Sequence, residues 1–78
     1  MTVTENFRFL HILDMRNGNV LSYAPDVGLG VIKTSDGQNF IFVAEDWLSL
    51  DIKPKAGTSV TFEESGSMAK QIKIISLP

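Results

Sequence analysis

The sequence predicts an all-β fold, a small five-stranded barrel preceded by an extra N-terminal strand or segment. A chain of 78 residues is long enough for one small domain with one modest core. Glycine, proline, asparagine, aspartate and serine recur at short intervals, and the segments between them are rich in β-branched and aromatic residues. Short segments of this kind, separated by turn residues, are typical of small barrels and sandwiches.

The turn residues delimit five expected strands. Period-two alternation is clearest near the C-terminus, where Val60 and Phe62 alternate with polar neighbours and Ile72 and Ile74 do the same. Such alternation indicates strands with one buried face, so these four residues are expected in the core. The expected strands are residues 20–24, 30–34, 40–44, 59–63 and 71–75.

A long connection is expected between the third and fourth strands. Its apolar residues fit neither one strand face nor one helical face, and Pro54 stops any helix. These apolar residues are Trp47, Leu48, Leu50 and Ile52. Five strands with one long connection at this point suggest an OB-type barrel.

The sequence divides into an N-terminal extension, residues 1–17, and a barrel domain, residues 18–78. Within the extension, alternate apolar residues fit one strand face, and Asn17 with Gly18 is a strong hairpin signal. A helix is the alternative, since Phe7, Leu10 and Asp14 share a helical face, but the aromatic content favours a strand. The alternating residues are Phe7, Phe9, His11, Leu13 and Met15.

The barrel sequence resembles bacterial cold-shock domains. Residues 18–32 align without a gap to the family's opening, approximately G-T-V-K-W-F-N-x-x-K-G-F-G-F-I. Residues 41–43 look like part of its F-V-H-F motif, residues 57–63 like G-x-x-V-x-F-E, and residues 69–72 like A-x-x-V. The resemblance implies an OB-type barrel that binds single-stranded RNA or DNA by stacking bases on aromatic rings, with lysines at the phosphates.

Most of the family's aromatic platform is replaced in this chain. Only Tyr23 and Phe42 keep a ring, and Ser22 stands at the tryptophan position. Each stacked base is worth about 1–3 kcal/mol, so the lost rings remove several kcal/mol of binding. The other replacements are Leu29 and Val31 for two phenylalanines, Ala44 and Glu45 for the histidine and last phenylalanine, and Leu21 and Val27 for lysines.

The first functional hypothesis is weak, non-specific binding of single-stranded RNA or DNA. Bases would stack on Tyr23, Phe42 and, if its indole is exposed, Trp47. The alternative for Trp47 is that it plugs the open end of the barrel. The phosphates would meet Lys33, Lys53 and Lys55. The net charge of −2 gives no global basic excess to support this hypothesis.

The second hypothesis is a module for protein–protein interaction or self-association that has lost nucleic-acid binding. Its interaction face would contain Leu29, Val31 and Ala44, beside Phe42. An exposed apolar patch of that size needs a cover. The sequence predicts that residues 3–15 cover part of the face or pair with a second copy of the chain.

No residue pattern indicates an enzyme, a metal site or a cofactor. The chain has no cysteine and one histidine, His11, with no nucleophile placed near it by the sequence. No apolar run is long enough for a membrane-spanning helix, and no secretory signal is recognisable. A cytoplasmic location and no membrane partner are therefore expected.

Overall fold

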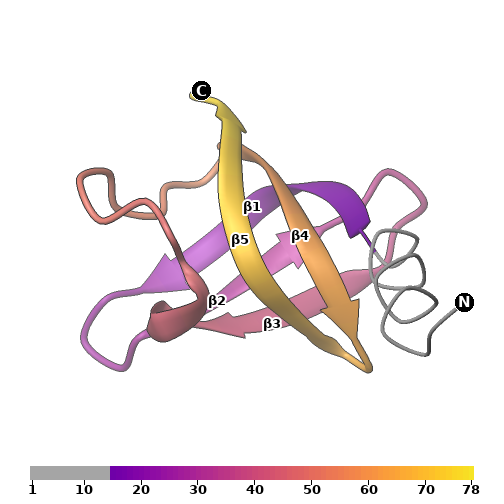
Figure 1. Ribbon diagram of the computed structural model, residues 1–78, viewed down its shortest axis with the longest axis horizontal. Coiled ribbons are helices and arrows are strands. Elements are labelled where there is room, and N and C mark those ends of the chain that lie inside the picture. The colour runs from indigo at the N-terminus through magenta and orange to yellow at the C-terminus, as the bar shows by residue number, and fades with distance from the viewer. Residues whose placement is uncertain (1–14) are drawn as a thin grey trace, which may run out of the picture.

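The computed structural model describes residues 15–78 as a closed barrel of five strands (Figure 1). The strand order around the barrel is β1-β2-β3-β5-β4. This confirms the predicted all-β fold and is consistent with a small OB-type barrel. The elements are β1 (Met15–Ala24), β2 (Leu29–Lys33), β3 (Asn39–Val43), the short 3₁₀ helix η1 (Ala44–Asp46), β4 (Ser59–Ser65) and β5 (Met68–Ser76).

The long strand β1 pairs with two different strands of the barrel. Its first half, from Met15 to Asn19, pairs antiparallel with β4, and its second half, from Asn19 to Ala24, pairs antiparallel with β2. A register shift between Val20 and Ser22 bends the strand between its two partners. A short parallel contact between β3 and β5 closes the barrel.

The core is formed by the inward residues of all five strands and by Trp47. Val60, Phe62 and Ile72 are fully buried as the alternation predicts, whereas Ile74 is half-buried and packs against the core. The buried apolar residues are Val20, Ile32, Phe40, Phe42, Trp47, Val60, Phe62, Ala69 and Ile72.

The turn that the sequence signals at Asn17 and Gly18 is not formed. Both residues lie within β1, where they pair with Thr61 and Val60 of β4. A Cβ atom on Gly18 would lie 2.6 Å from a methyl carbon of Ile32, so glycine here permits a close approach of the Ile32 side chain from the neighbouring strand β2. Strand β1 therefore begins upstream of Gly18, at Met15.

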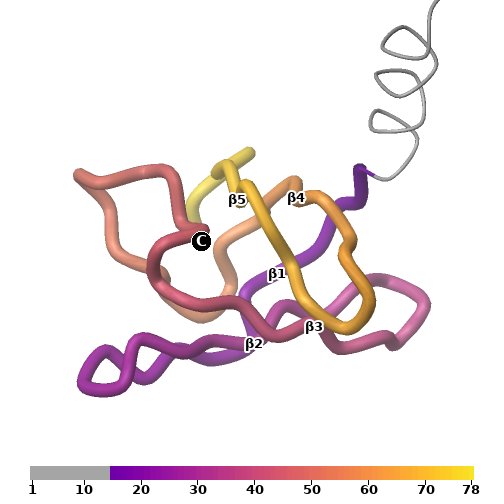
Figure 2. Tube along the Cα trace, turned by 60° about the horizontal axis from the view of Figure 1, so that its bottom comes forward, coloured from indigo at the N-terminus to yellow at the C-terminus, as the bar shows by residue number. Residues whose placement is uncertain are grey.

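The turns on either side of β2 lie at opposite ends of the barrel (Figures 1 and 2). The β1–β2 turn lies beside η1, because the backbone N–H of Ala44 donates a hydrogen bond to the carbonyl oxygen of Gly28 at 2.9 Å. The connection between η1 and β4 emerges at this same end (Figure 2). The β2–β3 turn lies at the other end, with the start of β1.

The expectations for residues 3–14, including the strand or helix around Phe7, the role of His11 and the cover over the barrel, lie outside the described residues. Between residues 15 and 78, no helix is long and apolar enough to cross a membrane.

Candidate binding face

The outward side chains of β1, β2 and β3 form one continuous surface. Because strand residues alternate between faces, the core positions Ile32, Phe40 and Phe42 leave their neighbours pointing outward. Cross-strand pairing arranges these neighbours in two adjacent rows. We call this surface the outer face; its rows are Ser22, Val31 and Ile41, and Ala24, Leu29 and Val43.

The outer face is apolar and partly exposed. Leu29 and Ile41 each keep 46% of their surface exposed, and Val31 is half-buried between them. The face contains a shallow groove of about 290 Å³ lined by its own residues and by Tyr23 and Gly30. None of its six residues carries a charge, and none is aromatic.

A stack of three aromatic rings supports the floor of the groove. The Phe42 ring lies between Tyr23 and Trp47, with both centroid distances 5.8 Å. Gly30 makes room for it, since a Cβ atom at Gly30 would lie 2.2 Å from Cζ of Phe42. Glycine at this position of β2 therefore allows the Phe42 ring to lie against the β2 backbone beneath the groove.

Two of the three predicted stacking residues are buried. Phe42 has 0% of its surface exposed and Trp47 has 6%. The indole Nε1 of Trp47 donates a hydrogen bond to the carbonyl oxygen of Ile52 at 2.6 Å, which fixes the ring in the barrel. Neither ring offers a face to a nucleic-acid base in this conformation, and only Tyr23 is partly accessible.

Trp47 therefore plugs the barrel, but without the neighbours expected to join it. Leu48 and Ile52 are exposed, and Leu50 keeps 92% of its surface exposed. The connection contributes one buried ring and leaves its aliphatic side chains at the surface.

The predicted phosphate-binding lysines are exposed but dispersed. Lys33 ends β2 at the end of the barrel that carries the β2–β3 turn. Lys53 lines a depression with Tyr23 and Trp47, and it also lines a second depression with Lys55 and Leu77 that does not include Tyr23. Neither of these two depressions, both within residues 15–78, brings Lys33 together with Lys53 and Lys55 beside the Tyr23 ring.

Two of the three residues predicted for the interaction face lie on the outer face, and the third lies at its edge. Leu29 and Val31 lie on the outer face, and Ala44 is exposed in η1 at its edge. Phe42 points the other way, because a shift of one residue along a strand reverses the face. The sequence reasoning missed Ile41, although its position between two inward phenylalanines on a period-two strand could have identified it.

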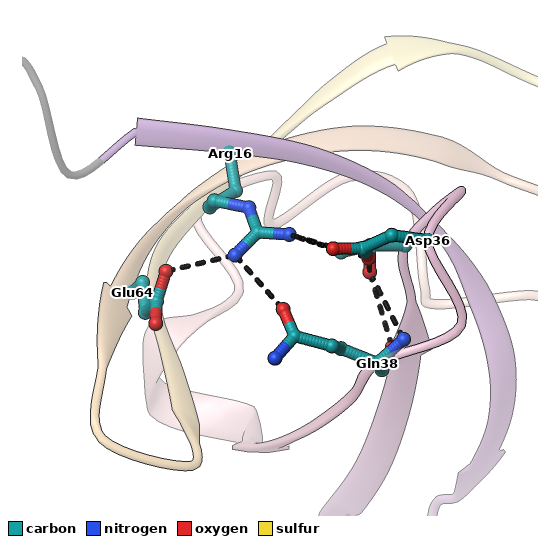
Figure 3. A network of polar contacts seen from close by, with 5 residues as sticks. Arg16, Asp36, Gln38 and Glu64 are labelled. Carbon is teal, nitrogen blue, oxygen red and sulfur yellow. Dashed lines mark hydrogen bonds and ion pairs between the residues drawn. The ribbon is translucent and has the colours of Figure 1, made fainter.

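A polar cluster lies away from the outer face, at the start of β1 (Figure 3). Arg16 forms ion pairs with Glu64 at 3.0 Å and Asp36 at 3.3 Å, and its guanidinium carbon lies 5.4 Å from the centroid of the Phe40 ring. The hydroxyl of Thr34 donates a hydrogen bond to Asp36. This hydrogen bond, with help from the backbone of Gln38 and the charge of Arg16, holds the pKa of Asp36 below its usual value.

The polar cluster ties the β2–β3 turn to β1 and β4, which is a structural role. Among residues 15–78 there is no group of three or more histidine, cysteine, aspartate or glutamate side chains that could hold a metal ion.

Compared with models of known protein families and with curated protein sequences, the chain matches none.

Proposed function

We propose that the chain is a protein-docking module that binds its partner through the outer face. The observation that carries this proposal is the chemistry of that face. Its two rows are uncharged and, apart from Ser22, apolar. The exposed side chains of Leu29 and Ile41 line the groove on this face. Exposed contiguous apolar surface of this kind marks sites of protein interaction.

The same features disfavour single-stranded nucleic acid as the partner. Base stacking needs accessible rings, and the phosphate backbone needs a track of cations beside them. The outer face carries neither, since Phe42 and Trp47 are buried and Lys33 lies beyond its apolar rows. The sequence resemblance to cold-shock domains lies in residues that form the barrel strands and turns, but Ser22, Leu29 and Val31 favour a different partner.

The proposal is tested by photo-crosslinking in the native cell. A photoreactive amino acid replaces Ile41 on the outer face or, as a matched control, Lys73, which is exposed on β5. We expect Ile41 to yield discrete protein adducts that survive nuclease and disappear on protease treatment. The Lys73 position should yield none of these adducts.

A second substitution distinguishes specific docking from nonspecific capture. Leu29→Glu places a charge in the groove, and it should remove the adducts formed at position 41 without unfolding the barrel, because Leu29 is exposed. Adducts from position 41 that nuclease destroys, or no adduct at all, would contradict the proposal.

A further inference from the structure

Exposed charges of opposite sign flank the two ends of the outer face, and Lys53 lines a depression with Ala44 and Tyr23 beside the acidic end. At one end, Lys33 lies in the next row of the sheet between Asn19 and Asn39. At the other end, Asp26 lies in the β1–β2 turn and Glu45 in η1, two segments joined by the Ala44–Gly28 hydrogen bond. Lys33, Asp26 and Glu45 are all exposed. The apolar rows therefore lie between a basic end and an acidic end.

These three charges are not engaged elsewhere in the barrel. The ion pairs among residues 15–78 join Arg16 to Asp36 and Glu64, and Lys70 to Asp46. Asp36 shares an end with Lys33, but its carboxylate is already bound by Arg16. Lys33, Asp26 and Glu45 take part in none of these ion pairs and are available to a partner.

A surface with an apolar centre and opposite charges at its ends is complementary to itself. If two copies stack face to face with a two-fold axis midway between the two apolar rows and parallel to them, the basic end of each copy meets the acidic end of the other. Stacked sheets lie about 10 Å apart, a spacing at which apolar side chains interdigitate. We propose that the partner of the outer face is a second copy of this chain, bound in this antiparallel two-fold arrangement. This inference rests on the proposed docking function of the face.

The small size of the outer face indicates that this dimer is weak. Three strands about 4.8 Å apart and five residues at about 3.3 Å each span roughly 14 by 17 Å. This footprint is well below the roughly 800 Å² that each partner buries in a standard stable interface. The dimer is therefore expected to be weak and transient.

Sedimentation equilibrium of the full chain, from about 0.02 to 2 mM, tests the proposal through charge reversal. Lys33→Glu alone, or Asp26→Lys with Glu45→Lys, should each weaken self-association on the order of 5–20-fold, because symmetry places the repulsion at both ends. An equimolar mixture of these two variants should restore association, since every end then meets its opposite charge. Ile41→Lys should abolish association, whereas Lys73→Glu, away from the face, should leave it unchanged.

The outcomes separate this inference from the proposed function. A wild-type chain that stays monomeric over the whole range, or variants that do not rescue each other, would overturn the two-fold dimer. Association that survives Ile41→Lys would show that another surface is used. If the chain is monomeric while position 41 still crosslinks to a different protein, the docking function stands and the second copy is excluded. If position 41 crosslinks to nucleic acid, both proposals fail.

Discussion

Replacing Gly30 by alanine tests the packing beneath the outer face. The new Cβ atom would lie 2.2 Å from Cζ and 2.4 Å from Cε1 of Phe42. Nonbonded carbons rest no closer than about 3.5 Å, so the ring must move by more than about 1 Å. Tyr23 on one side and Trp47 on the other restrict that movement, and the ring has no exposed surface.

The expected net effect is a loss of about 2 kcal/mol in the free energy of unfolding. Overpacking costs about 1–3 kcal/mol, and the severity of this overlap places Gly30→Ala at the upper end. The lower chain entropy of alanine in the unfolded state recovers about 0.5–1 kcal/mol. A domain of this size has about 4–12 kcal/mol in total, so the variant should still fold.

Urea denaturation followed by the fluorescence of Trp47, the single tryptophan, measures this loss. With a slope of about 1 kcal/mol per molar urea, the midpoint should fall by about 2 M. In a Phe42→Leu background the ring is gone, and the cost of Gly30→Ala should fall by at least half. The control is Gly37→Ala, where nothing lies within 4 Å of the new atom and only the positive φ is strained.

The cost of Gly37→Ala should be the same with and without the Phe42 ring. A Gly30→Ala variant as stable as the parent, or an equal cost in both backgrounds, would refute the assignment of Gly30 as the space for Phe42.

Two further predictions concern the core and the polar cluster. Phe62→Ala should lower the free energy of unfolding by about 3–5 kcal/mol, because the ring is fully buried against Phe40 at a centroid distance of 5.1 Å. The exposed Leu50→Ala should change it by less than about 0.5 kcal/mol, and equal urea midpoints for the two variants would contradict the core assignment. The lowered pKa of Asp36 means that its carboxylate stabilises the fold above the unfolded-state pKa, about 3.9, and that this contribution is lost as the pH falls through the folded-state pKa. Asp36→Asn should therefore be less stable than the parent at pH 7 and lose less stability between pH 5 and 3, and identical pH profiles would contradict the role of the cluster.

The strands were predictable because the sequence signals that specify them lie within a few neighbouring residues. Each expected strand overlaps an observed one, since the turn residues and the period-two alternation act over a few neighbouring residues. The exception is the start of β1, where Gly18 follows Asn17 and suggests a turn. The glycine is needed instead because the Ile32 side chain approaches it from the neighbouring strand β2, a contact between residues distant in sequence.

The binding face was predictable only in part, for a related reason. Leu29 and Val31 are exposed or half-buried as expected, but Phe42 is buried, and Ile41, which is not among the residues predicted for the face, is exposed there. Alternation determines which residues share a face, but not which of the two faces is the core. That choice depends on Gly30 and on the rings of Tyr23 and Trp47, which only the assembled barrel brings beside Phe42.

The central claim, that the outer face docks protein rather than nucleic acid, is tested most directly by titrating the full chain with labelled single-stranded RNA and DNA. Fluorescence anisotropy at 50 and 200 mM salt is the readout. Neutralising three phosphates at Lys33, Lys53 and Lys55 would give a slope of log affinity against log salt of about −2. The account predicts no saturable binding with such a slope. Binding that weakens steeply with salt and is lost in Tyr23→Ala would contradict it.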